Sequence, residues 1–387
     1  MDYGILSFYH REIAICVLLL LLFVWQLIDY YYNDVALLRW YKALKEGKLP
    51  VVETFQPISV IVYAEENAEE LRQTLPALLA QDYPAFEVIV VNDGKTDLIK
   101  DYVTALQQTY SNLYHTYVPE NAKYISRRKL ALTIGTKAAH YEWIATTVAG
   151  AVPSSDKWLK GMAAHLTEQT ELLLGYSNFL SSNSLCSRYI AYDGLVDSVT
   201  YLSAAIHAHP FKGDGRNLFY RKSLFFSKSG FRSHLNLKSG EDDLFVNELA
   251  TSANTRICCT PDTLMRQPIS SRLLWRNHKH KYAASARFYK RKSPLLRRSR
   301  SLSLYLFYAA VLALLFSSIV SHWIFSCIGA LFFLLRYAAL QYYRVRLYAL
   351  LGERADYCTW LLFELCRPFV DLHYRCGRFG RDYTWKI

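Results

Sequence analysis

Acidic residues are missing from one long stretch of this chain: there is no aspartate or glutamate from Thr263 through Gly352. Within that stretch, Arg266–Arg300 carries twelve lysines and arginines, and the formal charge of the whole chain is +12. Such a segment suits an anionic partner, either lipid headgroups beside a membrane or phosphate groups in an active site. Nucleic acid is a poorer partner, because the sequence contains no nucleic-acid-binding module.

Zinc-ligand spacing is also missing. None of the eight cysteines has that spacing, and two of them, Cys16 and Cys327, lie in apolar runs. This pattern argues against a zinc module and a disulfide framework, and it indicates reduced thiols. A glycine-rich phosphate loop with a lysine is absent near the first predicted strand, which disfavours a nucleotidyltransferase.

Two long apolar runs contain no charge. Ile13–Ile28 leads into Tyr30-Tyr31-Tyr32, and Ser301–Leu335 is the longer run. A membrane-spanning helix needs about 20 residues, so the first run predicts one crossing and the second predicts a tight hairpin. The turn is expected near Ser321-His322, with the second arm continuing towards Leu340. The alternative for the first run is a secretory signal peptide, which needs a small-residue cleavage site that this sequence lacks.

Basic residues flank both runs on the sides that face the middle of the chain, and they also follow the second run. They are Arg39, Lys42, Lys45 and Lys48, then Lys290, Arg291, Lys292, Arg297, Arg298 and Arg300, and finally Arg344 and Arg346. Lysine and arginine collect on the cytoplasmic side of membranes. The middle and the C-terminus are therefore expected inside the cell, and the N-terminus outside.

Strands and helices alternate between the two runs. Short, nearly all-apolar segments predict strands at Ile58–Tyr63, Phe86–Val91, Leu113–Val118 and Trp143–Thr147. Intervening segments predict helices at Ala68–Gln81, about Leu98–Tyr110 and Lys129–His140. This alternation indicates a parallel sheet with helices on both faces. Since such sheets bind ligands at the carboxyl ends of their strands, Tyr63–Glu66, Asn92–Gly94 and Thr147–Pro153 are expected around one crevice.

Several segments carry a family resemblance. They are Pro57–Leu71 (PISVIVYAEENAEEL), Gln81–Pro84 (QDYP), Phe86–Gly94 (FEVIVVNDG), Lys129–Leu132 (KLAL), Gly215–Leu218 (GRNL), Tyr220–Ser223 (YRKS) and Ser239–Asn247 (SGEDDLFVN). In number and order they resemble family 2 glycosyltransferases with the GT-A fold, from Pro57 to about Tyr289. The flanking segments resemble family members of Bacteroides-like bacteria, which carry one N-terminal anchor and a C-terminal hydrophobic region.

The resemblance implies an α/β, GT-A-like (Rossmann-like) mixed sheet domain flanked by transmembrane helices. The expected segments are a transmembrane anchor (1–34), a cytoplasmic linker (35–54), the GT-A domain (55–290), a transmembrane hairpin (301–342) and a cytoplasmic or interfacial tail (343–387). In the tail, Tyr357–Leu372 mixes apolar and charged residues and predicts a helix lying in the membrane interface. The expected location is the bacterial inner membrane, multi-pass, with the catalytic domain cytoplasmic.

The resemblance assigns Asp93, Glu65 and Arg128 to the nucleotide sugar. Asp93 ends the second strand, where the family uses an acid to contact the base or ribose. An ordinary Asn-Asp-Gly turn is the alternative interpretation of that position. Glu65 or its neighbour Glu66 ends the first strand, but Glu66-Asn67 departs from the Asn-Glu order that is more frequent in the family.

Asp242 is the expected general base. The family places a carboxylate here, following Glu or Asp and opening a helix, so that it faces the anomeric carbon from the acceptor side. A helix N-terminus lowers the pKa of such a group and keeps it ionised. The alternative is that Glu241, Asp242 and Asp243 only cap a helix. Glu241, Asp243 and Trp275 are assigned to the acceptor side.

The largest departure from the family is Val148-Ala149-Gly150. Family members usually carry Asp-x-Asp here, and those acids hold a divalent cation against the donor diphosphate. Mg²⁺ or Mn²⁺ is expected for the family, but these three residues offer no side-chain ligand, so no protein-held metal is expected. Asp156 is nearby, but is better explained as the cap of the following helix.

A basic segment offers another way to neutralise the diphosphate. Where the family has Gln-x-x-Arg followed by an aromatic residue or histidine, this chain has His278-Lys279-His280-Lys281-Tyr282. Lys281 stands in for the arginine and His278 for the glutamine, and both are assigned to the nucleotide sugar. A lysine serves a phosphate as a point charge.

Two functions remain open at this point. The first is inverting glycosyl transfer from a UDP- or GDP-linked sugar to an acceptor hydroxyl at the cytoplasmic membrane face, in cell-surface glycan or glycolipid synthesis. Its partners are the nucleotide sugar and a membrane lipid or lipid-linked acceptor, not nucleic acid. The second is a degenerate, non-catalytic glycosyltransferase-like protein that acts as a membrane partner or scaffold.

Overall fold

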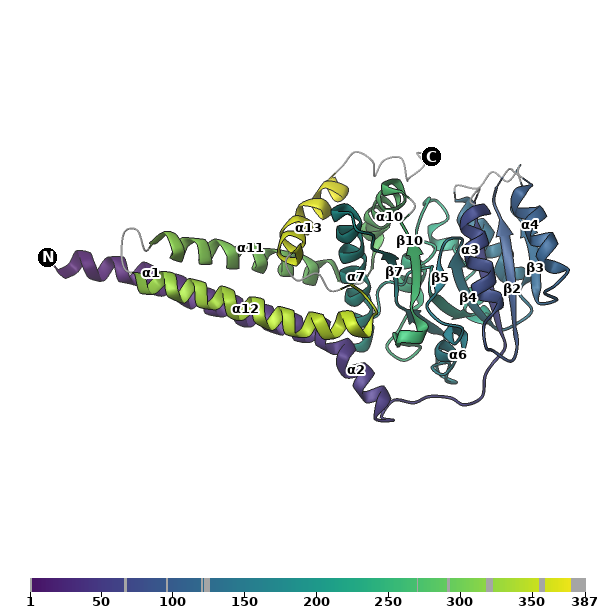
Figure 1. The fold of residues 1–387 in the computed structure, drawn as a ribbon, viewed down its shortest axis with the longest axis horizontal. Helices are drawn as coiled ribbons and strands as arrows, with labels where there is room; N and C mark the ends of the chain where they lie inside the picture. Colours follow the sequence, from purple (N-terminus) through teal and green to yellow (C-terminus); the bar gives the residue numbers. More distant parts are fainter. Residues whose placement is uncertain are drawn as a thin grey trace. The chain divides into compact units, whose positions relative to one another are not determined.

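The computed structural model describes residues 2–65, 68–94, 97–119, 121, 126–269, 271–290, 293–317, 323–354 and 359–376. They form two compact units (Figure 1). The helical unit consists of Met1–Arg39 and Lys292–Pro368. The sheet unit consists of Trp40–Arg291 and Phe369–Ile387.

Four parallel strands form one half of the main sheet. They are β1 (Ile58–Ala64), β2 (Phe86–Asn92), β3 (Leu113–Tyr117) and β4 (Trp143–Val148), in the spatial order β3-β2-β1-β4. Each lies within one residue of its predicted bounds. The register pairs Tyr63 with Val91 and with Val148, which brings the carboxyl ends of three strands to one edge.

Three further strands make the sheet mixed. They are β8 (Leu218–Arg221), β6 (Leu172–Gly175) and β9 (Thr255–Cys258), and they continue the order β4-β8-β6-β9. β8 is antiparallel to both β4 and β6, whereas β6 and β9 are parallel. The α/β, mixed-sheet class that the resemblance implied is confirmed.

A small second sheet lies next to the end of β4. It contains β5 (Val152–Pro153), β10 (Met265–Pro268) and β7 (Ser177–Leu180), in the order β5-β10-β7. Arg266 pairs with Val152, so β10 runs beside the segment that follows β4. The chain at residues 265–268 is thereby brought to the edge where the predicted crevice lies.

Helices cover the sheets of this unit. They are α3 (Ala68–Leu79), α4 (Leu98–Gln107), α5 (Arg127–Ala138), α6 (Trp158–Ala163), α7 (Leu185–Ile206), α8 (Lys222–Ser227), α9 (Asp243–Leu249) and α10 (Arg272–Ser285), with short 3-10 turns at Arg232–His234, Pro261–Thr263 and Ala286–Phe288. The apolar stripe of α3 (Leu71, Leu75 and Leu78) packs into the same core as the strand residues Val60 and Val88. Burial of this stripe explains the helix better than its composition does.

The predicted cap at Asp156 is wrong. The helix there begins at Trp158, and its N-cap is Lys157, which makes no side-chain capping bond. The Asp156 carboxylate instead accepts a hydrogen bond from the Ser155 hydroxyl at 3.1 Å. The hydroxyl of Ser155 also accepts from the Lys157 backbone N–H at 3.1 Å, so a serine turn precedes this helix in place of an aspartate cap.

Long helices form the helical unit, although the ends of two of them, Trp40–Lys45 and Phe369–Cys376, belong to the sheet unit. α1 (Asp2–Tyr30) continues through a π-helical turn (Tyr31–Val35) into α2 (Ala36–Lys45), and α11 (Ser293–Ser317), α12 (Trp323–Leu350) and α13 (Thr359–Cys376) complete the list. α1, α11 and α12 run side by side (Figure 1). Their shared core contains Leu19, Phe307 and Leu314. Two helices of the described chain, His10–Lys45 and Trp323–Leu350, are long and apolar enough to cross a membrane.

Buried charges join α13 to α12. Arg336 donates to Glu364 at 2.9 Å, and Arg344 lies 3.4 Å from the same carboxylate. Arg336 also donates to the Gln26 side chain of α1. The predicted turn at Ser321-His322 lies outside the described residues, as does the start of the predicted interfacial helix at residues 357 and 358.

Candidate active site

Asp93 lies at the carboxyl end of β2 and is almost fully buried. Its Oδ1 accepts from Arg127 Nε at 2.6 Å, and its Oδ2 accepts from the Tyr63 hydroxyl at 2.9 Å. The same hydroxyl is 3.2 Å from Glu65 Oε2. Burial and the charges of Glu65 and Asp93 raise the pKa of Tyr63 far above its ordinary value, so it remains a donor between two carboxylates. Glu66, the other candidate, lies outside the described residues.

Arg128, Glu241 and Lys281 meet where α5, the start of α9 and α10 converge. Arg128 Nε is 3.0 Å from Glu241 Oε1, and Lys281 Nζ is 2.8 Å from the same oxygen. The guanidinium of Arg128 also lies 5.3 Å from the centre of the Tyr63 ring. The residues assigned to the nucleotide sugar thus lie in one connected region, except for His278.

Asp242 accepts four hydrogen bonds. Its Oδ2 receives Lys281 Nζ at 3.0 Å, the Tyr282 hydroxyl at 2.7 Å and the Gly215 backbone N–H at 2.9 Å, while Oδ1 receives the Asp243 N–H at 2.9 Å. Burial alone would raise the pKa of Asp242. The charges of Lys281 and Arg128 overcome that effect and hold the pKa well below its usual range. Asp242 is therefore ionised and firmly oriented.

Asp243 faces the other way. It accepts from the hydroxyls of Ser285 and Tyr289, the latter at 2.7 Å, and from the Leu244 N–H at 2.9 Å. Burial, followed by the neighbouring charge of Asp242, raises the pKa of Asp243 to about 6. Its carboxylate joins α9 to the end of α10.

Asp243 should make stability depend on pH. Its pKa is about 6 in the folded protein, against about 3.9 for an unfolded aspartate. Ionisation therefore costs more in the folded state, and the free energy of unfolding should fall as pH rises from about 4 to 6. Asp243→Asn should be more stable than wild type at pH 7.5, by up to about 3 kcal/mol, and no more stable at pH 4. Thermal unfolding in detergent at both pH values checks this; an equal difference at both would contradict it.

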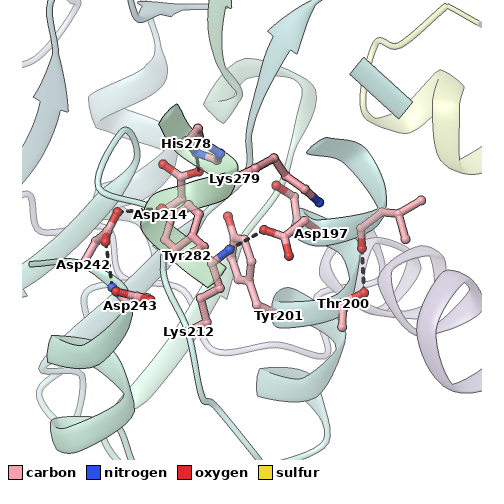
Figure 2. Close-up of polar contacts among 12 residues, drawn as sticks. Asp197, Thr200, Tyr201, Lys212, Asp214, Asp242, Asp243, His278, Lys279 and Tyr282 are labelled. Atoms are coloured by element: carbon pink, nitrogen blue, oxygen red, sulfur yellow. Dashed lines mark hydrogen bonds and ion pairs between the residues drawn. The ribbon is translucent and has the colours of Figure 1, made fainter. Parts of the chain in front are cut away.

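His278 lies in a second buried cluster on α10. Its Nε2 is 3.7 Å from Asp214, which holds Arg216 through two hydrogen bonds of 2.7 and 3.0 Å (Figure 2 shows the His278–Asp214 contact). Burial lowers the pKa of His278 to about 4, so the ring is neutral. Its ring centre is 4.6 Å from that of Tyr282, and Tyr282 is the link between this cluster and Asp242.

Trp275 is separate from Asp242 in its contacts. Its indole N–H donates to Asp193 at 3.2 Å, and its ring packs edge-on against Tyr189. Lys279, one turn further along α10, lies 3.0 Å from Asp193 and 2.6 Å from Asp371. Trp275 and Lys279 therefore attach α10 to α7, and Lys279 also attaches it to Asp371, which belongs to the same sheet unit.

The segment Val148–Gly150 at the end of β4 is packed into the protein interior. Val148 and Ala149 are buried in the core cluster, and the Gly150 N–H donates to the hydroxyl of Thr74 at 2.8 Å. Gly150 has a φ of +90°, and a Cβ at this position would lie 3.1 Å from Glu70 Oε2. An aspartate at position 150 would thus be strained and would face a carboxylate.

A divalent cation does not fit this segment. Its side chains supply no ligand, and nowhere in the described ranges do three His, Cys, Asp or Glu side chains form a metal-binding group. Glu70 is the carboxylate that lies against Gly150. Replacing Val148 and Gly150 by aspartate is consequently a poor test of metal binding, because an aspartate at position 150 would be strained and would lie against Glu70.

Comparisons with known proteins agree with this geometry. The model of glycosyl transferase family 2 matches residues 58–183. The mannosyltransferase PcManGT from Pyrobaculum calidifontis, solved with GDP-Man and Mn²⁺, superposes with a TM-score of 0.55 at 16% identity, over 94% of this chain and 99% of that chain. The sheet unit has the GT-A fold.

TarS 1-349 from S. aureus also aligns, with a TM-score of 0.42 at 19% identity, over 84% of this chain and 91% of that chain. The same protein in complex with UDP-GlcNAc gives a TM-score of 0.40 at 18% identity, over the same shares of the two chains. No curated protein matches the chain in sequence. The fold assignment therefore rests on the family match and on the structure of PcManGT.

The GT-A domain contains polar residues that the sequence did not single out. Arg127 holds Asp93, and Lys212 lies against Tyr282. Arg216 was visible in Gly215–Leu218, but its partner Asp214 was not. One grouping could have been predicted from helical spacing. Residues 275 and 279 are four apart, as are residues 278 and 282, so each pair lies on one face of a helix.

Proposed function

We propose that the GT-A domain transfers a sugar, with inversion, from a nucleotide-diphosphate donor to an acceptor hydroxyl. The observation that carries the proposal is the ammonium of Lys281, which lies between Glu241 and Asp242 at 2.8 and 3.0 Å. It joins the proposed base, Asp242, to a cation suited to the departing diphosphate. The family match at residues 58–183 supports sugar transfer, and the GDP-Man in PcManGT supports a donor linked to a nucleoside diphosphate.

The donor would lie along the carboxyl ends of β1 and β2. Asp93 and Glu65 would contact the nucleoside, with Tyr63 and Arg127 keeping the Asp93 carboxylate in place. Arg128 and Lys281 would neutralise the diphosphate as its negative charge develops. Because Val148-Ala149-Gly150 supplies no ligand, we assign this neutralisation to the two basic side chains and derive no step through a metal.

Transfer of the Lys281 ion pair from Asp242 to the donor diphosphate would activate the base. In the free protein Lys281 helps keep the pKa of Asp242 low, which makes Asp242 a weak base. A diphosphate that takes Lys281 removes this charge, so the pKa of Asp242 rises. Asp242 then accepts the proton of the acceptor hydroxyl, while the oxygen of that hydroxyl bonds to the anomeric carbon. The bond from that carbon to the phosphate oxygen breaks, and the electron pair leaves with the diphosphate, held by Arg128 and Lys281.

Nucleotide binding tests the proposal directly. Purified protein should bind UDP or GDP, measured by calorimetry, and EDTA or added Mn²⁺ should change the affinity little. If the folded protein bound neither nucleotide under any metal condition, the proposed enzymatic activity would be rejected. The second candidate is a non-catalytic scaffold. It is favoured by the segment Val148–Gly150, which is buried and has no side chain that could bind a metal ion. Capture of another glycosyltransferase by a chain without nucleotide affinity would support it.

We also propose that α1 and α12 cross the bacterial inner membrane, with α11 as the first arm of a hairpin, and that the acceptor is lipid-linked. The support is the length and apolar character of two helices and the basic residues on their flanks. The exposed apolar residues of α13, among them Leu362 and Phe369, would then face the lipid interface.

Reporter fusions test this topology. A reporter joined after Lys48 should be active only in the cytoplasm, because four basic residues from Arg39 to Lys48 follow the first apolar run. A reporter placed before Arg11 should show the opposite behaviour. Paired alkaline phosphatase and green fluorescent protein fusions make the measurement. Phosphatase activity of the Lys48 fusion would place the GT-A domain on the wrong side for a cytosolic donor.

A further inference from the structure

A buried lysine lies against the ring of Tyr282. Lys212 is 2% exposed, and its Nζ is 3.5 Å from the centre of the Tyr282 ring. On its other side the ammonium forms an ion pair with Asp197 of α7 (Figure 2). The hydroxyl of the same tyrosine donates to Asp242 at 2.7 Å. A cation, an aromatic ring and a carboxylate are thus arranged in series.

Side chains on one side of α7 hold Lys212 in this position. Asp193, Asp197 and Tyr201 are one helical turn apart and share one side of that helix. Asp193 pairs with Lys279 and Asp197 with Lys212, so both carboxylates are used to hold lysines. The Tyr201 hydroxyl donates to the Gly175 carbonyl at 2.7 Å, which attaches this side of α7 to the main sheet. Lys212 is therefore held by Asp197, which lies on a helix that is itself attached to the main sheet.

We propose that Lys212 is a positioning residue for the base, acting on Asp242 through Tyr282. This inference rests on the proposed function of Asp242. A cation over the face of a phenol is attracted by the negative face of the ring, and it strengthens the hydroxyl as a donor. Tyr282 is otherwise close to the carboxylates of Asp214, Asp242 and Asp243, all of which raise its pKa and keep it protonated, after the larger effect of burial.

Lys212 becomes important when Lys281 moves to the donor. Asp242 then loses one donor and its nearest positive charge, while the Gly215 N–H, the Asp243 N–H and Tyr282 remain. Of these, only the Tyr282 hydroxyl is backed by a buried ammonium. Lys212 cannot follow the diphosphate in the same way, since Asp197 and the ring hold it on both sides.

A double-mutant cycle tests the pathway. Lys212→Met should lower kcat for release of UDP or GDP from the corresponding nucleotide sugar by about tenfold, on the scale of a desolvated cation–aromatic contact. KM for the donor and the affinity for UDP or GDP should stay within about twofold. In a Tyr282→Phe background, which keeps the ring but removes the hydroxyl, Lys212→Met should have little further effect on kcat. Lys212→Arg should restore part of the rate, and Lys222→Met serves as a control at a lysine that donates to the Ala139 carbonyl.

A stability measurement decides the proposal even if no nucleotide sugar is turned over. The changes in Tm for Lys212→Met and Asp242→Asn in detergent should be non-additive when Tyr282 is present and additive in the Tyr282→Phe background. Additive changes in both backgrounds would overturn the proposal, as would equal kcat losses in both. Absence of nucleotide binding by the wild type, with the thermal coupling intact, would reject the proposed function and leave the Lys212–Asp242 link standing.

Discussion

Asp242→Asn is expected to lower the turnover number by about 100-fold or more, because an amide cannot accept the proton of the acceptor hydroxyl. Binding of UDP or GDP should be unchanged or slightly tighter. The reason is that Lys281, which lies 3.0 Å from the Asp242 carboxylate, would then be less strongly held within the protein. Donor turnover and calorimetric affinity, measured on the same preparation, separate these two effects.

Asp262→Asn provides the matched control, since Asp262 is an exposed acid in a 3-10 turn of the same domain. It should leave both quantities unchanged. Retained activity in a folded Asp242→Asn variant would move the base to Glu241 or Asp243. Of these, Glu241 is the better candidate, because its Oε2 is buried without a hydrogen-bond partner among the described residues and its other oxygen meets Lys281.

The first half of the sheet could be predicted because local pattern determines it. The runs that form β1 and β4 are buried from end to end, and the run that forms β2 is buried from Glu87 onward; that is the pattern of a parallel strand covered on both faces. The antiparallel position of β8 could not be predicted. Nothing in Leu218–Arg221 shows that it pairs with β4, some seventy residues earlier in the chain. Strand order depends on long-range packing, which a local sequence pattern does not contain.

The candidate site divides in the same way. The sequence predicted a carboxylate at the start of a helix and assigned Lys281 to the donor, and the structure brings Asp242 and Lys281 within 3.0 Å of each other. It did not show that His278 faces Asp214, or that Trp275 faces Asp193. Both depend on how α10 packs against α7 and the loop before β8. The shape of the loop at Gly150 could not be predicted either, because its positive φ and its closeness to the carboxylate of Glu70 result from tertiary packing.

Lys281→Ala should weaken binding of UDP and GDP by about 1–3 kcal/mol, the usual scale of a charge-assisted contact. The predicted loss is about 5- to 150-fold in Kd. Burial would lower the pKa of Lys281, but Asp242 and Glu241 raise it above its ordinary value, so the residue is a cation at any working pH. Lys279→Ala is the matched control: it removes a lysine two positions away that pairs with Asp193 and Asp371 instead.

Loss of Lys281 also leaves two buried carboxylates short of a cation, which destabilises the fold. Lys281→Ala combined with Glu241→Gln removes one charge of each sign and should recover much of the Tm while nucleotide binding stays weak. EDTA should change the Kd of the wild type by less than twofold, because Val148, Ala149 and Gly150 supply no metal ligand. A large loss of affinity in EDTA, together with normal binding by Lys281→Ala, would show that a metal ion neutralises the diphosphate. The search for its ligands would then begin at Glu70, the carboxylate that lies against Gly150.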